Sequence, residues 1–382
     1  MDFALSPEHE ELVRTLRQFA RKELAPRSRD WDRTREFPWD AWRRMGELGL
    51  LGLRIPAAYG GQPADLLTMG LALEEIARGD FSCTYGIQLA ALAGEILGGH
   101  GAEEVKQRWL PPTARGDTVI ALALTEPDVG SDAANLACRA VRDGAHYVLT
   151  GEKSGISLGM AAQASIVFAR TSAERARGIT AFLVDMSLPG VTRSVLRDMG
   201  SHALQRAVIS LDGVRVPAGH RLGAEGTGFY QVMKGFDWNR ICIGLACLGI
   251  AAESLEETMR YVKERRAFGK PLATFEGVSF RIAEAATHVE AARWLAYRAL
   301  WLADRGEPST KEASMVKWWA PKLAVETIHQ CLLLHGHYGY TDELPFEQRL
   351  RDVIGLEIGD GTAEIMKVIV ARELMGRGSL PY

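Results

Sequence analysis

An aspartate between two glycines near the C-terminus is the residue whose position most directly suggests chemistry. Asp360 lies in the stretch IGDGT, where a loop meets a predicted amphipathic helix. A carboxylate there could cap the helix, bind a metal or act as a base towards a substrate. Taken alone the pattern favours a cap, although Gly359 and Gly361 count slightly against it, because they also let another molecule approach the backbone closely.

Two polar segments earlier in the chain could hold a ligand. In LTEPDVGSDAANL (residues 124–136) a strand ends in a loop, whose free N–H groups, with the hydroxyls of Thr125 and Ser131, could bind an anionic or heteroaromatic group. An ordinary turn is the alternative, and the local pattern favours it. In GEKSGISLG (residues 151–159), Gly155 inside a strand indicates a bulge or a close ligand, and Ser157 adds a hydroxyl.

Two further motifs contain cations and histidines. In ERRAFGKPLATFEGVSF (residues 264–280), Arg265 follows a helix and could bind a pyrophosphate, or it could satisfy the helix C-terminus. In HGHYGYTDELPFEQRLRD (residues 335–352), His335 and His337 are two residues apart, but no HExxH or spaced Cys/His set accompanies them. We therefore expect no metal.

Composition excludes several classes of protein. With 382 residues the chain is expected to form two or three domains, and a net charge of -3 without a long basic run speaks against a nucleic-acid or membrane surface. The five cysteines form no CxxC pair, which suits a reducing compartment. The N-terminus has no signal-peptide pattern and no apolar run reaches membrane-spanning length. A cytoplasmic protein is expected.

The pattern of elements divides the chain into three parts. Residues 1–118 show helical periodicity, beginning with Ser6 as cap and Pro7 in the first turn. Residues 119–228 have β-branched runs with hairpin signals at Asp143-Gly144 and Asp212-Gly213. Residues 229–382 show four amphipathic helical segments, which favour a bundle. The predicted domains are an N-terminal α-helical domain (1–118), a middle β domain (119–228) and a C-terminal four-helix bundle (229–382).

Four stretches in the same order, TEPDVGSD, RRAFGKPL, GYTDELPFEQRLRD and DGTAEIMKVIVARE, resemble those of the acyl-CoA dehydrogenase family, over essentially the whole chain. The resemblance implies an N-terminal helical domain, a middle β-barrel or sandwich domain and a C-terminal four-helix bundle, usually in a homotetramer. It also implies FAD-dependent α,β-dehydrogenation of an acyl-CoA thioester, with an electron-transfer flavoprotein as the acceptor.

The resemblance identifies Asp360 as the base, at a position where the family has glutamate before Gly-Thr. Its backbone N–H would bond the thioester carbonyl, with Gly361 and Thr362 beside it near the flavin. Some members place the base just before the arginine of FDWNR, where this chain has Asn239, which cannot usefully accept a proton. Asp360 therefore keeps the role.

The resemblance also assigns cofactor and substrate residues. Ser157 matches a hydroxyl that bonds flavin N5, while Arg265 and Phe268 match positions that reach the FAD of a neighbouring subunit. The residues expected at FAD are Leu124, Thr125, Gly130, Ser131, Gly155, Ser157, Arg265, Phe268, Gly336, Thr362 and Glu364. Those expected at the substrate are Ser131, Gly361 and the Asp-x-x-Arg pair beside the pantetheine, Asp237 and Arg240.

Several positions depart from the family pattern. Aspartate in place of glutamate withdraws the carboxylate by about 1.5 Å, and misplacement on the order of 1 Å can cost ~10²-fold in rate. Gly155 stands where the family usually has a large aromatic, Leu158 replaces a usual Asn, and Leu333 a usual Gln. Because the glycine opens space and the short base needs a substrate that approaches it, we expect a bulky, branched or cyclic acyl group. The chain looks most like the cyclohexanecarboxyl-CoA type.

Three alternatives remain open from the sequence. A nitroalkane-oxidase-like flavin oxidase also uses an aspartate here but depends on a following arginine, and the nearest basic residue in this chain is Lys367. A dehydrogenase could act on an acyl group bound to a carrier protein. A non-enzymatic scaffold on the same fold would lack a bound flavin.

Overall fold

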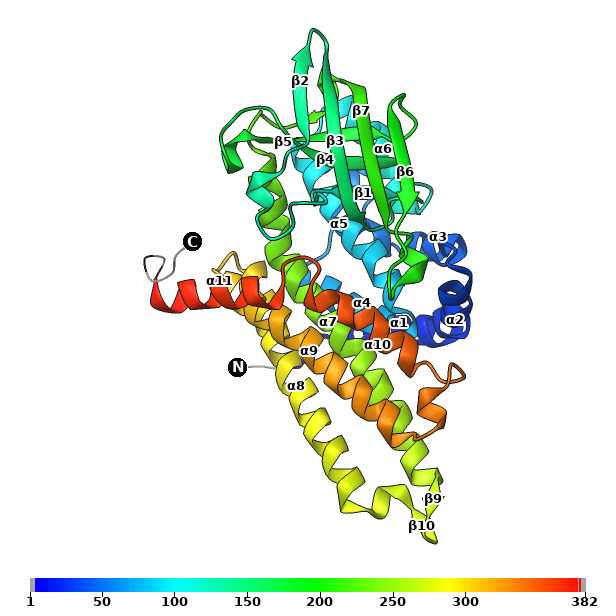
Figure 1. The fold of residues 1–382 in the computed structure, drawn as a ribbon. Coiled ribbons are helices and arrows are strands. Elements are labelled where there is room, and N and C mark those ends of the chain that lie inside the picture. Colours follow the sequence, from blue (N-terminus) through cyan, green and yellow to red (C-terminus); the bar gives the residue numbers. More distant parts are fainter. Residues whose placement is uncertain (1–3, 377, 379–382) are drawn as a thin grey trace.

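The computed structural model describes residues 4–376 and 378. In chain order a helical part, a β-sheet and a second helical part follow one another, as the sequence predicts (Figure 1). The sheet lies at one end of the molecule. The long C-terminal helices extend away from it (Figure 1).

The N-terminal part is helical throughout. Ser6 caps its first helix by accepting a hydrogen bond from the His9 backbone at 3.2 Å, with Pro7 in the first turn, which confirms the predicted start. A π-helical turn, Ala20–Leu24, joins the first two helices next to Pro26, whose ring nitrogen cannot donate a backbone hydrogen bond. The helices are α1 (Pro7–Phe19), α2 (Ala25–Thr34), α3 (Trp39–Glu47), α4 (Leu66–Gly79), α5 (Phe81–His100) and α6 (Glu103–Arg115).

The middle part is one mixed sheet with the order β6-β7-β3-β2-β4-β5-β8, and β1 pairs in parallel with β4. β2 and β3 form the hairpin expected near Asp143, with Asp143 paired to His146. The strands are β1 (Ile120–Ala123), β2 (Arg139–Asp143), β3 (His146–Ile156), β4 (Ala164–Arg170), β5 (Ile179–Asp185), β6 (Val191–Val195), β7 (Ala207–Pro217) and β8 (Arg221–Leu222).

The second predicted hairpin, at Asp212-Gly213, is wrong. Both residues lie inside the single strand β7. Against β3, the pairing steps from Leu149–Val214 to Gly151–Leu211, so Asp212 and Gly213 lie opposite the single residue Thr150 in a β-bulge. Gly213 has φ +62°, a conformation found in bulges as well as in hairpin turns, so an Asp-Gly pair in the sequence is compatible with either.

The C-terminal part contains three long helices, α7 (Gly228–Glu264), α8 (Glu276–Asp304) and α9 (Thr310–Leu334), and two shorter ones, α10 (Phe346–Ile354) and α11 (Ala363–Met375). A short β-ribbon, β9 (Arg266–Ala267) with β10 (Lys270–Pro271), lies at the far end of α7 and α8 (Figure 1). α11 packs on α9 near the end of the long helices that is closer to the sheet (Figure 1).

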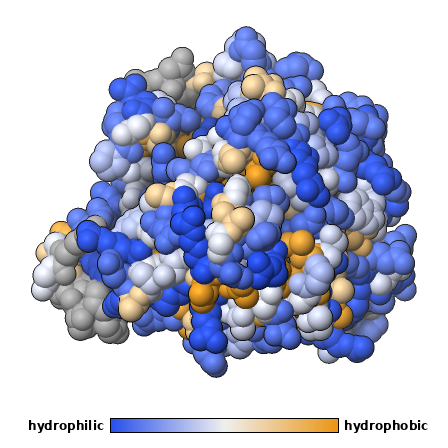
Figure 2. Space-filling view, turned by 90° about the horizontal axis from the view of Figure 1, so that it is seen from above, coloured by the Kyte–Doolittle hydropathy of each residue, from blue (hydrophilic) through white to orange (hydrophobic). Residues whose placement is uncertain are grey.

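Within the described residues, none of the helices combines the length and apolar character needed to cross a bilayer. The face seen from above in Figure 2 is mostly hydrophilic, with small separate hydrophobic areas. The same residues contain no group of three or more His, Cys, Asp or Glu side chains arranged to hold a metal ion.

Candidate active site

The loop between α10 and α11 presents Asp360 without using it as a helix cap. The cap of α11 is Thr362, whose side-chain oxygen accepts a hydrogen bond from the Ile365 backbone at 3.3 Å. Asp360 has a left-handed backbone with φ +55°, unusual for a residue with a side chain. Its half-buried carboxylate makes no hydrogen bond to any residue that the structure describes. The cap interpretation is therefore wrong, and the carboxylate is available.

A buried lysine fixes this loop from the side of α9. The Nζ atom of Lys317 donates to the carbonyl of Leu356 at 2.6 Å and to the carbonyl of Gly361 at 3.1 Å. Burial lowers the pKa of Lys317 to about 8, against the opposing charge of Asp360. Two carbonyls that bracket Asp360 are thus held by one rigid helix, which restricts the position of the carboxylate.

The predicted pantetheine pair lies beside the same loop. Arg240 on α7 donates from Nη1 to Asp237 at 3.3 Å, and Thr310 at the start of α9 donates to the other Asp237 oxygen at 3.2 Å. Burial lowers the pKa of Arg240, and the carboxylates of Asp237 and Asp360 oppose that shift. A side-chain carbon built on Gly361 would lie 3.8 Å from Arg240 Nη2. The structure therefore brings Asp237, Arg240, Asp360 and Gly361 together.

The TEPDVGSD loop is shaped by a buried ion pair that the sequence analysis missed. Glu126 accepts hydrogen bonds from the backbone N–H groups of Ala137 and Cys138 and from Lys153 Nζ at 2.8 Å. The Lys153 side chain is fully buried and also bonds the Leu124 carbonyl. These bonds hold Thr125 and the rest of the loop against β3.

The end of β3 joins this loop to Arg206 and to Tyr85. The Ser154 backbone bonds the Thr125 carbonyl at 2.9 Å, and Gly155, with φ +70°, has no atom within 4 Å of where a side-chain carbon would lie. Ser157 Oγ accepts a hydrogen bond at 3.2 Å from Arg206, which also donates to the hydroxyl of Tyr85 on α5.

The charge of Asp360 acts on Tyr85. Burial raises its pKa, Arg206 opposes the shift, and the carboxylate of Asp360 adds to it. Ser157, Arg206 and Tyr85 thus form one hydrogen-bonded chain, close enough to Asp360 for the charge of its carboxylate to act on Tyr85.

Three predicted cofactor residues lie elsewhere in the chain. Arg265 ends α7, and Phe268, 95% exposed with φ +49°, lies at the tip of the β-ribbon at the far end of the C-terminal helices. Gly336 follows α9 at that same end, where Tyr261 stacks on His335 at 4.1 Å. Within one chain these residues do not share a site with Asp360. Their predicted contact with the FAD of a neighbouring subunit remains a prediction.

Comparison with known proteins identifies the family. Sequence models of acyl-CoA dehydrogenases match the chain in three pieces: the N-terminal domain at residues 6–117, the middle domain at 121–214 and the C-terminal domain at 226–375. The mitochondrial short-chain specific acyl-CoA dehydrogenase of Rattus norvegicus is 38% identical over 371 residues, which is 96% of this chain and 90% of that protein. This chain belongs to the acyl-CoA dehydrogenase family.

Solved structures agree over the whole fold. Glutaryl-coenzyme A dehydrogenase in complex with glutaryl-CoA has a TM-score of 0.94 and 33% identity, covering 99% of this chain and 98% of that one. PigA with FAD and proline has a TM-score of 0.95 and 27% identity, covering 99% and 100%. The dehydrogenase described here is thus an FAD-dependent oxidoreductase that acts on acyl-CoA.

The residues of this dehydrogenase fit FAD. The hydroxyls of Thr125 and Ser131 are exposed and have no hydrogen-bond partner among the described residues, so they are free for a ligand. Gly130 and Gly155 leave open space where side chains would lie. Polar groups of this kind, on a loop with exposed backbone, suit a flavin ring and its phosphates.

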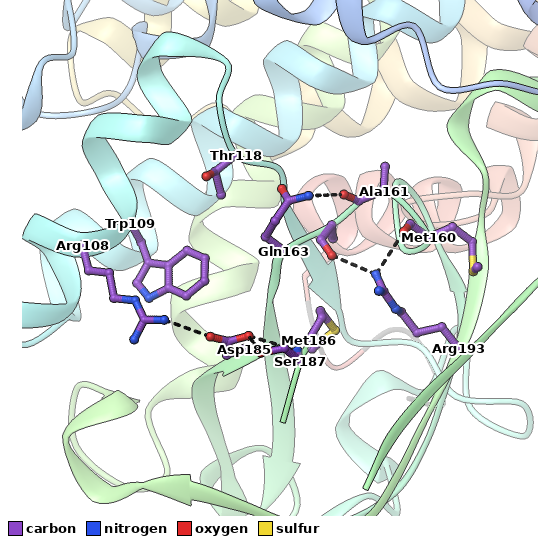
Figure 3. Close-up of a pocket in the computed structure, with 11 residues that line it drawn as sticks. Arg108, Trp109, Thr118, Met160, Ala161, Gln163, Asp185, Met186, Ser187 and Arg193 are labelled. Carbon is purple, nitrogen blue, oxygen red and sulfur yellow. Dashed lines mark hydrogen bonds and ion pairs between the residues drawn. The ribbon is translucent and has the colours of Figure 1, made fainter. Parts of the chain in front are cut away.

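One cavity of the dehydrogenase is not part of this site. It measures about 520 Å³ and lies between α6 and the sheet (Figure 3). Arg108 pairs with Asp185 at 3.0 Å, and Arg193 donates to the carbonyls of Gly159, Met160 and Ala162. Its charged groups are already paired within the protein, and no predicted site residue lines it.

Several residues that shape the site, including Lys153, were not predicted from the sequence. Glu126 belongs to a quoted motif but was not singled out, and Lys317 is a lone lysine in an apolar helical stretch, a signal that could have been followed. Tyr85 and Arg206 have no local signal, because their neighbours in the sequence resemble ordinary helix and strand residues. Only the packing of α5 against the loop before β7 brings them to Ser157.

Proposed function

We propose that this protein catalyses α,β-dehydrogenation of an acyl-CoA thioester whose acyl group is bulky, branched or cyclic, similar to cyclohexanecarboxyl-CoA. Asp360 is the base that removes the α-proton. The observation that carries the proposal is a carboxylate held in a strained backbone next to two glycines, while Thr362 takes over the cap of α11.

The chain's own groups account for the proton transfer. One Asp360 oxygen takes the α-proton, and the Asp360 N–H donates to the thioester carbonyl, where negative charge develops. Lys317 fixes the loop through the carbonyls of Leu356 and Gly361, so little reorganisation is needed when the proton moves. Bound FAD supplies the acceptor for the β-hydrogen and its electron pair.

Two features support a bulky acyl group. The open space at Gly155 would accept a ring that an aromatic side chain would exclude. The aspartate is one methylene shorter than glutamate, so the α-carbon must lie about 1.5 Å closer to the backbone. A branched or cyclic acyl group fills more width next to the thioester than a straight chain does.

Further assignments follow the same proposal. Thr125, Gly130, Ser131, Gly155, Ser157 and Thr362 hold FAD within one subunit, and Arg265, Phe268 and Gly336 reach the FAD of a neighbour in a homotetramer. An electron-transfer flavoprotein reoxidises the enzyme in the cytoplasm. An arginine-dependent nitroalkane oxidase is disfavoured, because Lys367 lies 3.9 Å from Glu364 and over the ring of Trp318.

Anaerobic titration with CoA thioesters tests the proposal. We expect cyclohexanecarboxyl-CoA and isobutyryl-CoA to bleach the flavin faster than butyryl-CoA or octanoyl-CoA. Asp360→Asn should keep FAD and still bind the thioester, because only the proton acceptor is lost, but the flavin should no longer bleach. Bleaching that survives in Asp360→Asn, or a clear straight-chain preference in the wild type, would contradict the proposal.

A further inference from the structure

Arg206 and Tyr85 form a polar pair next to Ser157, the residue expected at flavin N5. Arg206 donates from Nε to Ser157 Oγ at 3.2 Å, from Nη1 to Asp198 at 2.9 Å and from Nη2 to the Tyr85 hydroxyl at 3.1 Å. Its guanidinium also lies over the ring of Tyr85 at 5.4 Å. Tyr85 in turn feels the charge of Asp360. The surroundings of Ser157 are therefore polar where an ordinary fatty acyl chain would need apolar surface.

The loop before β7 holds Arg206 in this position. The Leu196 backbone donates to the Arg206 carbonyl at 2.7 Å, and the Ser201 backbone donates to the buried carboxylate of Asp352 on α10. His202 bonds the Asp198 carbonyl at 3.1 Å. The loop is thus fixed to a helix on one side and to itself on the other, and the bonds to Asp198 and Ser157 hold the guanidinium next to Tyr85.

The hydroxyl hydrogen of Tyr85 has no acceptor among the residues that the structure describes. Its oxygen accepts from Arg206, so the O–H hydrogen points to a different partner, and none exists among the described residues. Tyr85 is only 7% exposed, so water can replace such a partner only from within the site. Burial raises its pKa, which keeps the hydroxyl protonated at neutral pH. The site thus contains a buried donor polarised by a guanidinium.

An apolar acyl group would leave this donor unpaired. A buried polar group without a hydrogen-bond partner is unfavourable, and sites built to hydrogen-bond a substrate oxygen discriminate strongly against analogues that lack it. A neutral acceptor fits better than an anion, because Asp198 already neutralises Arg206 and Asp360 contributes a negative charge nearby.

We propose that the acyl group of the substrate carries a neutral oxygen, as a hydroxyl or a carbonyl, away from the thioester, and that the Tyr85 hydroxyl, backed by Arg206, donates to it. This inference rests on the proposed dehydrogenation of a bulky or cyclic acyl-CoA. It makes Tyr85 a specificity-determining residue and Arg206 the residue that positions it.

Cyclohexanecarboxyl-CoA thioesters substituted at ring position 3 or 4 test the inference. The substituents are hydroxyl, oxo, methyl and carboxylate, with the unsubstituted ring as reference. For the wild-type holoenzyme we expect kcat/KM of the better hydroxyl or oxo isomer to exceed that of its methyl counterpart by about 10- to 100-fold. Tyr85→Phe should reduce this ratio to near 1, whereas Tyr230→Phe, at a half-exposed tyrosine on α7, should keep it.

The outcomes separate the two proposals. If methyl and oxygenated rings are oxidised equally well by the wild type, or if the carboxylate-bearing ring is the best substrate, the inference is wrong while the dehydrogenation stands. If Tyr85→Phe folds, binds FAD and keeps the oxygen preference, Tyr85 is not the donor and the inference is wrong as well. If no thioester in the series bleaches the flavin, the proposed function itself fails.

Discussion

Lengthening the base by one methylene is the sharpest perturbation of the site. Asp360→Glu keeps the charge and restores the side-chain length that the family usually has at this position. The backbone has little freedom to absorb the change, since Lys317 bonds the Leu356 and Gly361 carbonyls at 2.6 and 3.1 Å and Thr362 fixes the start of α11. The carboxylate should therefore advance by about 1.5 Å towards the substrate.

The expected effect on rate follows from this displacement. Misplacement of a catalytic group by on the order of 1 Å can cost ~10²-fold, which corresponds to about 2.7 kcal/mol of activation free energy. With cyclohexanecarboxyl-CoA the longer acid should crowd the α-carbon, and flavin reduction should slow by roughly that factor. With butyryl-CoA, a narrower substrate that can shift in the open space at Gly155, the rate should hold or rise.

Anaerobic stopped-flow absorbance measures both rates in the same preparation. Glu357→Asp, a change of one methylene three residues earlier in the same loop, is the matched control and should leave the ratio of the two rates unchanged. If Asp360→Glu reduces the flavin with cyclohexanecarboxyl-CoA as fast as the wild type does, the length of the base does not select the substrate and the reasoning is refuted.

Three further predictions concern the residues around the base. Burial lowers the pKa of Lys317 from 10.5 to about 8, so between these pH values the unfolded chain binds the proton more tightly than the folded protein does. In urea unfolding, the free energy of unfolding of the wild type should rise by up to about 3 kcal/mol relative to that of Lys317→Met between pH 8 and pH 10.5. A difference that does not change with pH would contradict this. Gly155→Trp should raise KM for cyclohexanecarboxyl-CoA at least about tenfold, because the indole fills the open space. Gly155→Ala needs the same left-handed backbone without the bulk and should leave KM unchanged. If both variants raise KM equally, backbone strain and not lost space is the cause. Glu126→Gln should destabilise the protein by about 3–5 kcal/mol, because it leaves the buried ammonium of Lys153 without its carboxylate. Adding Lys153→Met should recover part of the lost thermal stability. If it does not, the bonds of Glu126 to the backbone account for most of the lost stability.

The sequence predicted the order of the domains because each part has its own periodicity. The apolar spacing of the long C-terminal segments required helices, and these appear as α7, α8 and α9. Short-range turn chemistry was less decisive. Asp143-Gly144 marked a real hairpin, whereas Asp212-Gly213 marked a bulge, because a glycine with positive φ suits either and only the register with β3 distinguishes them.

The sequence by itself determined which residue types this dehydrogenase offers, namely the acid of IGDGT, the polar loop of TEPDVGSD and the hydroxyl of KSGISLG. Whether Asp360 caps α11 depended on which residue bonds the first turn of that helix, and only the structure shows that Thr362 does so. The structure alone placed Tyr85 and Arg206 next to Ser157, because Tyr85 and Arg206 come from segments more than 100 residues apart. Local patterns encode secondary structure, but contacts between distant segments arise when separate elements pack, and those contacts decide what an active site recognises.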